Sequence, residues 1–217
     1  MNRSIFLGLG ANLAGRIGTP GSTLRQSIAM LECSGIKLRR ASSLYVTTPV
    51  GGGRQPYYLN AVIEVTCPFT PACLLRIAKQ IERYAGRQRN RRNGPRPLDI
   101  DILDYRGRVI GTPAARRPHL VLPHPELADR RFALIPLLEI APAWWHPRLR
   151  HPGKALLARL SSASGAVQRI LDSSWVSCDQ EQMARNAFGG ALRISAPGAA
   201  VLRKTGAHNE ARSRDET

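Results

Sequence analysis

Two acidic residues stand one position apart in the segment NGPRPLDIDILDY, residues 93–105. If this segment is a strand, Asp99 and Asp101 project from the same face, while Ile100 and Ile102 point the other way into the core. Adjacent carboxylates repel each other unless a positive charge lies between them. Mg²⁺ supplies such a charge, because it takes one or two carboxylates and completes its coordination with water and phosphate oxygens. The polar face of an edge strand is the alternative explanation.

Five arginines precede this strand within ten residues, namely Arg87, Arg89, Arg91, Arg92 and Arg96. Guanidinium groups bind phosphate oxygens through paired hydrogen bonds, and a loop of this length can fold over a bound anion. A solvated basic loop and an RNA-contacting patch are the alternatives. Arginines beside a metal-spaced carboxylate pair favour phosphoryl transfer more than either feature alone, because a polyphosphate bridged to the acids through Mg²⁺ satisfies both signs of charge.

The charge balance is strongly basic, with 32 Lys and Arg against 15 Asp and Glu among 217 residues, a formal net charge of +17. Residues 1–171 hold all of the excess, since 172–217 carry six residues of each sign. Such a field attracts nucleic acid, nucleotides and acidic lipids alike. The length fits one domain, which we place at 1–175, followed by a low-complexity and partly disordered C-terminal tail at 176–217.

Targeting signals and disulfide patterns are not evident in the sequence. The N-terminal apolar run IFLGL is too short for a signal sequence or a membrane span, and no stretch of about 18 apolar residues occurs. We therefore expect a cytoplasmic location and no membrane partner. Cys33, Cys67, Cys73 and Cys178 lack metal-ligand spacing and are predicted to be buried or incidental free thiols.

The elements that must position the acids follow from periodicity and from capping residues. We expect a strand at 3–9, a helix capped by Ser22, an extended stretch at 36–47, a strand at 57–67 buried on both faces, a helix from Thr70 to Gly86, a strand at 97–105 with a possible hairpin partner at 107–111, and a helix around 126–139. The order β-α-β-β-α-β predicts an α+β, ferredoxin-like split βαβ fold, an antiparallel sheet with helices packed mainly on one face.

Three glycines follow the first strand, at Gly8, Gly10 and Gly15. A dinucleotide-binding fingerprint starting at Gly8 requires glycine at position 13, where Leu13 stands. These glycines are better explained by a tight turn or by close approach of another backbone.

The segment GPRPLDIDIL resembles the signature of the 6-hydroxymethyl-7,8-dihydropterin pyrophosphokinase family, which reads Gly-Pro-Arg, two variable residues, then two aspartates separated by an aliphatic residue. FLGLGANL, SSLYVTTPVG, QPYYLNAV and VLPHPELADRRFALIPLLEIAP resemble other segments of the family, in order, over about residues 4–142. The resemblance implies a magnesium-dependent enzyme of folate biosynthesis that transfers pyrophosphate from ATP to the hydroxymethyl group of the reduced pterin and releases AMP.

The resemblance also implies roles for particular residues. Asp99 and Asp101 would hold two Mg²⁺ ions, and Arg87 and Arg96 would face the phosphates from a mobile catalytic loop. The positions that match the ATP side are Leu75, Lys79, Glu82, Arg89, Ile102, His124 and Arg130. The positions that match the pterin pocket are Thr47, Val50, Tyr58, Asn60 and Phe132, a set that suits a flat heterocycle because it offers aromatic faces and an amide.

Four residues depart from the pattern of some relatives on the ATP side: Asn93, His119, Val121 and Pro125. The metal and pterin positions are intact, so an active enzyme is expected, with ATP and the pterin as partners and a monomeric state. One alternative is a basic ferredoxin-like RNA-binding module, although the aromatic strings of such modules are missing. A metal-dependent phosphohydrolase would leave the pterin-pocket residues unexplained.

Overall fold

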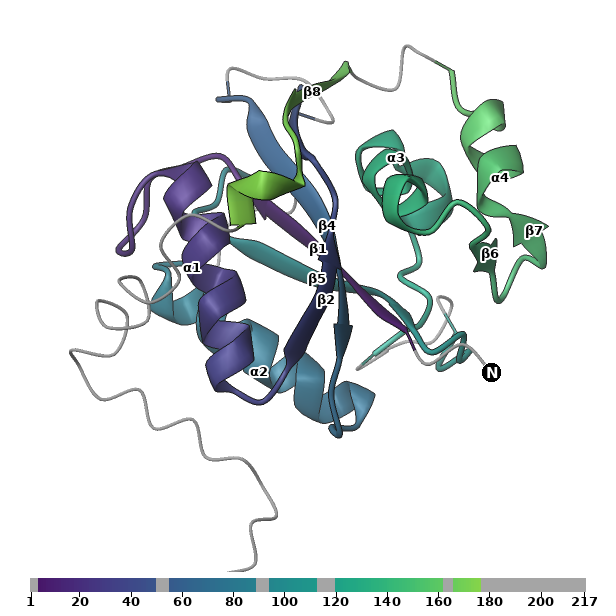
Figure 1. Ribbon diagram of the computed structural model, residues 1–217, viewed down its shortest axis with the longest axis horizontal. Helices are drawn as coiled ribbons and strands as arrows, with labels where there is room; N and C mark the ends of the chain where they lie inside the picture. Colours follow the sequence, from purple (N-terminus) through teal and green to yellow (C-terminus); the bar gives the residue numbers. More distant parts are fainter. Residues whose placement is uncertain (1–3, 50–54, 89–93, 113–119, 162–165, 177–217) are drawn as a thin grey trace, which may run out of the picture.

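A computed structural model of the protein describes residues 4–49, 55–88, 94–112, 120–161 and 166–176 (Figure 1). The elements in chain order are β1 (Ile5–Ala11), α1 (Pro20–Cys33), β2 (Lys37–Ala41), β3 (Leu44–Thr47), β4 (Tyr58–Thr66), α2 (Pro71–Tyr84), β5 (Asp99–Tyr105), η1 (Leu127–Asp129), α3 (Arg131–Ile140), β6 (Trp145–His146), β7 (His151–Pro152), α4 (Gly153–Arg159), β8 (Val167–Leu171) and η3 (Ser173–Val176).

An antiparallel sheet runs through the described residues in the order β5-β1-β4-β3-β8, and β2 pairs with the part of β4 that β3 leaves open. β1 pairs with β4 from Ile5 opposite Val65 to Ala11 opposite Leu59. On its other edge, β1 pairs with β5, which carries the two aspartates. The predicted burial of the 57–67 strand on both faces is confirmed, because six consecutive residues of β4 are buried.

Helices cover both faces of this sheet (Figure 1). α1 and α2 pack together on one face, where the main core includes Leu24, Leu74 and Ile100. α3 covers part of the opposite face through a second cluster that includes Phe6 and Leu134, and α4 packs against α3. The ferredoxin-like fold is therefore as predicted, with its two longest helices on one face, while α3 and α4 add a layer on the other.

Helix α2 begins and ends where the capping residues predict. The Thr70 hydroxyl accepts a hydrogen bond from the Cys73 backbone N–H at 3.3 Å, and Pro71 occupies the first turn, where its missing N–H costs nothing. Gly86 follows the helix with a φ of +100°, a conformation that favours glycine.

Helix α1 begins earlier than predicted. Its first residue is Pro20 and its N-cap is Thr19, so the expected cap at Ser22 is wrong by three positions. Ser22 instead lies in the first turn, where its hydroxyl donates to the Thr19 carbonyl at 2.9 Å. The same Thr-Pro pair begins both helices, which makes it the better signal in this chain.

Two other segments differ from expectation in detail. The extended stretch at 36–47 is divided into β2 and β3 at Ser42 and Ser43, and both strands pair with β4. The predicted hairpin partner at 107–111 does not pair with β5. Ile110 forms an isolated bridge with Leu122 instead, because the chain turns at Gly107 and Gly111, both with positive φ.

In the ranges that the structure describes, no helix has both the length and the apolar character that crossing a membrane requires. Cys33, Cys67 and Cys73 are free thiols, as predicted, and Cys178 lies outside the described residues. The description ends at Val176, so the predicted tail lies outside it except for that first residue.

Candidate active site

Strand β5 places the two aspartates opposite the glycines of β1. Asp101 stands opposite Gly8 and Asp99 opposite Gly10 in the antiparallel register. Both acids line the same two cavities, one of about 280 Å³ and one of about 770 Å³. The prediction that Asp99 and Asp101 project from one face is therefore confirmed. Tyr58 and Asn60, which the resemblance assigns to the pterin pocket, also line the smaller cavity.

Two arginines hold Asp99. Arg96 Nη1 lies 2.6 Å from Asp99 Oδ2, and Arg87 Nη1 contacts the other carboxylate oxygen. Burial opposes ionisation of Asp99, but the guanidinium groups of Arg87 and Arg96 outweigh it, so the pKa of this carboxyl lies below its ordinary value. Asp99 is therefore a carboxylate at neutral pH. Arg87 and Arg96 lie beside it in the lining of the larger cavity.

Asp101 has weaker partners. His124 Nε2 lies 3.8 Å and Arg130 Nη1 lies 3.9 Å from Asp101 Oδ2, distances too long for hydrogen bonds. Burial and the neighbouring charge of Asp99 raise the pKa of Asp101. A carboxyl in this state gains most from an added cation, which would stabilise its charged form.

His124 is oriented by its own loop. Its Nδ1 accepts a hydrogen bond from the Glu126 backbone N–H at 3.2 Å, which leaves Nε2 facing Asp101 and the cavity. Burial lowers the pKa of His124, so the neutral ring with a proton on Nε2 prevails at neutral pH. Such a ring donates one hydrogen bond to an anionic oxygen without adding charge.

Glu82 of helix α2 forms an ion pair with Arg87. Its Oε1 accepts from Lys79 Nζ at 2.7 Å, from Arg87 Nη1 at 2.8 Å and from the Ile100 backbone N–H at 2.8 Å. Only 2% of the Glu82 side chain is exposed. Burial raises its pKa, an effect that Lys79 and Arg87 partly offset. Glu82 thus fixes the start of β5 and the Arg87 guanidinium relative to α2.

Apart from Asp129, the residues that line only the smaller cavity are neutral. The Asn60 amide donates to the Thr47 hydroxyl at 2.7 Å, and both side chains are buried. Tyr58 donates to the Gly94 carbonyl at 3.0 Å, and burial raises the pKa of this phenol, so it stays protonated. Phe132 forms part of the wall, with Arg130 Cζ 5.4 Å from its ring centroid. An aromatic face beside a fixed amide suits a flat heterocycle.

The structure gathers most of the predicted site residues around these two cavities. The smaller one is lined by Thr47, Tyr58, Asn60, Arg96, Asp99, Asp101, Arg130 and Phe132, and the larger one by Lys79, Glu82, Arg87, Arg96, Asp99, Asp101, His124 and Arg130. Leu75 and Ile102 line neither cavity, because both pack against the main core, so their proposed nucleotide contacts gain no support. Val50 and Arg89 lie outside the described residues.

Asn12 is a site residue that sequence reasoning missed. Its Oδ1 accepts from the Arg96 backbone N–H at 2.8 Å, and its Nδ2 donates to the Pro56 carbonyl at 3.2 Å. It therefore ties the residues before β5 to those before β4. A polar residue directly after an apolar strand was its only signal in the sequence.

Gly8 and Gly10 of β1 line the smaller cavity, a role that the sequence did not predict. A Cβ on Gly10 would lie 3.0 Å from Asn60 Oδ1, and one on Gly8 would lie 3.3 Å from Leu103. The predicted approach of another backbone is found at Gly15, where a Cβ would overlap the Ala85 carbonyl oxygen, whereas the neighbours of Gly8 and Gly10 are side chains. Gly8 and Gly10 keep the floor of the smaller cavity free of side chains between Asn60 and the aspartates.

Of the two described residues that depart from the family pattern, one lines a cavity and one does not. Pro125 lines the larger cavity, whereas Val121 lines neither. Asn93 and His119 lie outside the described residues.

Comparisons with known proteins agree with this geometry. Residues 6–142 match the family model described as 7,8-dihydro-6-hydroxymethylpterin-pyrophosphokinase (HPPK). The 2-amino-4-hydroxy-6-hydroxymethyldihydropteridine pyrophosphokinase of Bacillus subtilis is 38% identical over 141 residues, which cover 64% of this chain and 79% of the relative. The corresponding protein of Methylorubrum extorquens is 39% identical over 63% of this chain and 82% of its own length.

Longer relatives contain further sequence. A mitochondrial folate synthesis bifunctional protein of Arabidopsis thaliana is 34% identical over 79% of this chain, but the chain spans only 32% of that protein. Among solved structures, wild-type HPPK-DHPS of Plasmodium falciparum superposes with a TM-score of 0.55 at 15% identity, covering 72% of this chain and 44% of that one. At this identity the likeness concerns the fold alone.

The match of residues 6–142 to this family model disfavours the alternative of a basic RNA-binding module. From its sequence match and from the two cavities that meet at Asp99 and Asp101, this chain belongs to the 7,8-dihydro-6-hydroxymethylpterin-pyrophosphokinase family.

Proposed function

We propose that this chain transfers pyrophosphate from ATP to the hydroxymethyl oxygen of 6-hydroxymethyl-7,8-dihydropterin, giving the pterin diphosphate and AMP in folate biosynthesis. One observation carries the proposal. The smaller and the larger cavity share Arg96, Asp99, Asp101, Glu126 and Arg130 as lining residues. A flat acceptor in the first cavity and a polyphosphate in the second would therefore meet at the aspartates.

The smaller cavity, which we call the pterin pocket, orients the acceptor. The Asn60 amide is held by Thr47, so its remaining hydrogen-bonding capacity points in a fixed direction. Phe132 supplies an aromatic face, and the glycines of β1 leave room for the ring system. Orientation of this kind places the hydroxymethyl group toward Asp99 and Asp101, which converts a bimolecular encounter into a positioned reaction.

The larger cavity, which we call the phosphate cleft, recognises ATP. Arg87, Arg96 and Arg130 supply guanidinium groups, and His124 offers a neutral N–H donor. Guanidinium groups that are paired with Asp99 can turn to phosphate oxygens when a dication takes over the carboxylate. The arginines would then stabilise the charge that develops on the transferred group.

The two aspartates fit magnesium. No group of three or more His, Cys, Asp or Glu side chains among the described residues is arranged to hold a metal. Two carboxylates are nevertheless enough for Mg²⁺, because phosphate oxygens and water complete its coordination. Asp99 and Asp101 offer oxygens from one strand face, and the raised pKa of Asp101 indicates a carboxyl short of positive charge. When bound, two Mg²⁺ ions would neutralise phosphate charge and lower the pKa of the attacking hydroxyl.

The decisive experiment is an assay for AMP release with the full chain, ATP and the pterin. We expect AMP only when both Mg²⁺ and 6-hydroxymethyl-7,8-dihydropterin are present. AMP or ADP formed at the same rate without the pterin would favour a phosphohydrolase and contradict the proposal. A monomeric state and a cytoplasmic location stay predictions of the sequence.

A further inference from the structure

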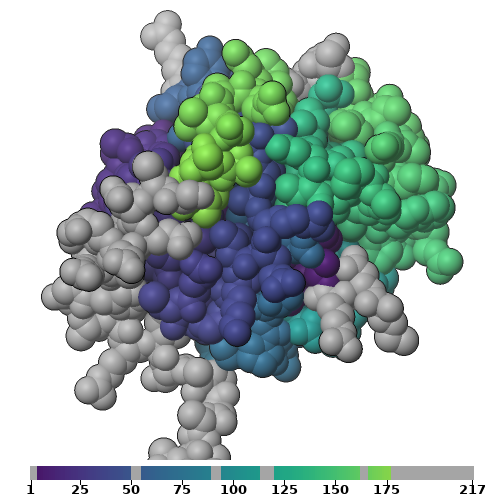
Figure 2. All heavy atoms as spheres, in the orientation of Figure 1, coloured from purple at the N-terminus to yellow at the C-terminus, as the bar shows by residue number. Residues whose placement is uncertain are grey.

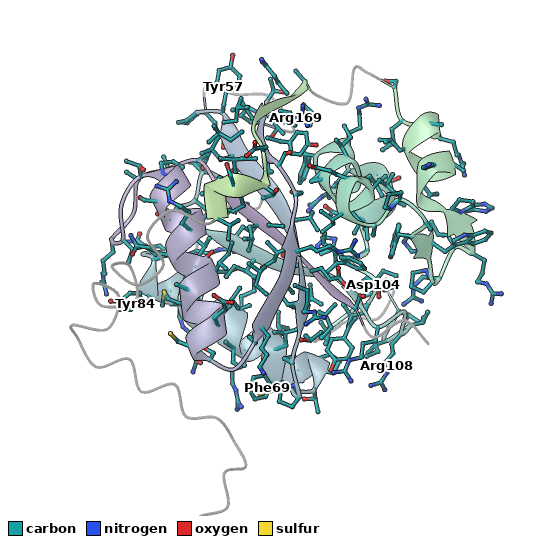
Figure 3. The ribbon with its side chains drawn as sticks, in the orientation of Figure 1. Tyr57, Phe69, Tyr84, Asp104, Arg108 and Arg169 are labelled. Carbon is teal, nitrogen blue, oxygen red and sulfur yellow. The ribbon has the colours of Figure 1, made fainter. Side chains whose placement is uncertain are left out.

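The C-terminal strand β8 forms the outer edge of the sheet beside the pterin pocket. It lies outside residues 6–142, which match the family model, and it pairs antiparallel with β3 from Leu44 opposite Leu171 to Thr47 opposite Val167. β3 carries Thr47, the hydrogen-bond partner of Asn60. Arg169 of β8 and Tyr57, directly before β4, project at the same end of the molecule (Figure 3). A movement of β8 would therefore act on the wall of the pocket.

The closest link between β8 and the pocket is Thr48. Thr48 lines the pterin pocket directly after Thr47. Its backbone N–H donates to the Ala166 carbonyl at 3.3 Å, and its hydroxyl accepts from the Ala166 backbone N–H at 3.2 Å. Both of these hydrogen bonds join Thr48 to Ala166, the residue directly before β8. The rim of the pocket depends on the position of this strand.

The anchor of β8 is Trp175 in η3. Its indole N–H donates to the Ser42 carbonyl at 2.8 Å, and only 4% of the residue is exposed. Trp175 and Val176 join the main core, with η3 lying against α1 (Figure 1). One large aromatic side chain therefore fastens the end of the chain segment that follows β8.

β8 itself buries little. Gln168, Arg169, Ile170 and Leu171 are exposed, and the segment forms a stripe on the surface of the molecule (Figure 2). Its position therefore depends on ladder hydrogen bonds and on the Trp175 anchor, not on an apolar face of its own. The start of β3 is secured independently, because Glu139 of α3 accepts from the Ser43 hydroxyl at 2.6 Å and from the Tyr45 hydroxyl at 2.8 Å.

We propose that β8, anchored by Trp175, positions the outer wall of the pterin pocket, and that Thr48 and Trp175 are positioning residues for the pterin. The inference rests on the proposed function and deepens it. Neither residue needs to touch the reacting atoms, since wall contacts that are equally strong before and during transfer contribute to KM for the pterin and not to kcat. The expected signature is a change in KM for the pterin with kcat and KM for ATP preserved.

Two substitutions in the full chain test this signature. Thr48→Val keeps the shape and the backbone N–H but removes the acceptor for Ala166, and Trp175→Phe keeps an aromatic ring but removes the donor to Ser42. For each we expect KM for the pterin to rise roughly 3- to 10-fold, the loss of about one hydrogen bond. Gln168→Ala, an exposed change on the same strand, is the matched control and is expected to leave KM unchanged.

Hydrogen exchange supplies a readout that does not depend on turnover. Trp175→Phe is expected to speed amide exchange at 44–48 and leave exchange in α2 unchanged. If the parent chain is active and KM for the pterin is unaltered in both variants, the inference is overturned. Unaltered exchange at 44–48 in Trp175→Phe, or a loss of stability without a change in KM for the pterin, would also overturn it. Absence of AMP formation by the parent chain would instead overturn the proposed function, and the exchange measurement would still test the coupling of β8 to β3.

Discussion

The phosphate cleft and the pterin pocket meet at Asp99 and Asp101 but are held together by different forces. In the cleft, Arg87 and Arg96 pair with Asp99, and Glu82 gathers Lys79 and Arg87. In the pocket, neutral donors and acceptors are matched, as in the bond from Asn60 to Thr47. Ion pairs can exchange one partner for another when a polyanion and dications arrive, whereas buried neutral hydrogen bonds have no competing ligand of that kind.

This contrast assigns different kinetic roles to the two regions. Groups that change partners as the phosphoryl charge develops should act mainly on kcat, because their interactions strengthen in the transition state. Groups that stay fixed should act mainly on KM for the pterin, since they bind the acceptor equally well before and during transfer. The predictions below test this division, from the largest expected effect to the smallest.

Asp101→Asn is expected to have the largest effect. The substitution keeps the size of the side chain but removes the charge that we assign to Mg²⁺, so kcat should fall by about 10³-fold or more. Affinity for the pterin should change little, which equilibrium titration can measure. Near-normal turnover with ATP and the pterin would contradict the assignment of Asp101 as a metal ligand.

Arg96→Lys tests whether the geometry of the guanidinium matters as well as its charge. Arg96 contacts Asp99 and donates from Nε to the Gly94 carbonyl at 3.1 Å, a set that one ammonium group does not reproduce. We expect kcat to fall roughly 10- to 100-fold, with KM for the pterin nearly constant. If KM for the pterin rises instead and kcat is retained, Arg96 belongs to the pocket and the division fails at this residue.

Asn60→Ala should show the opposite pattern. The change removes the amide that we place on the pterin edge, and the pterin group left unpaired in the pocket would cost roughly 1–3 kcal/mol, or about 5- to 150-fold in KM for the pterin. kcat at saturating pterin should stay within a few-fold of the parent. Thr47→Ser retains the hydroxyl and is the control, expected to behave nearly as the parent.

The sequence could predict features that depend on local signals but not contacts between residues far apart in the chain. The helix that begins at Thr70 and the strand that carries Asp99 were predictable because capping residues and apolar alternation are local signals. The hairpin partner at 107–111 was not, because Ile110 pairs with Leu122, further along the chain, and not with β5. The positions of η3 and β8 likewise depend on Trp175 reaching Ser42, a contact between residues 133 positions apart.

Glu82 shows where residue type misleads. A glutamate three residues after a lysine on a helix is typical of a solvent-exposed ion pair, and the family resemblance places it on the ATP side. The structure buries it against Ile100 and Arg87, at the lining of the larger cavity, because the Ile100 backbone N–H on the edge strand β5 donates to it. Its burial depends on the packing of α2 against β5, which no local pattern encodes.

That burial gives the last and smallest prediction, which concerns stability. The pKa of Glu82 lies above its ordinary value of 4.5, so between 4.5 and the raised pKa the folded chain holds more protons than the unfolded chain. The free energy of unfolding must then fall as pH rises through this window. Glu82→Gln retains an oxygen that accepts from Ile100 but has no proton to release, so the parent should lose stability relative to the variant as pH rises.

Urea unfolding of both proteins at several pH values from about 4.5 upward measures this difference, with groups common to both cancelling. Glu32→Gln, on an exposed position of α1, removes the same formal charge and serves as the matched control. A parent that gains stability relative to Glu82→Gln as pH rises would show that Lys79 and Arg87 outweigh burial. The ion pairs of Glu82 with Lys79 and Arg87 would then stabilise the fold without a ligand. Breaking the Arg87 pair to bind phosphate would cost more free energy.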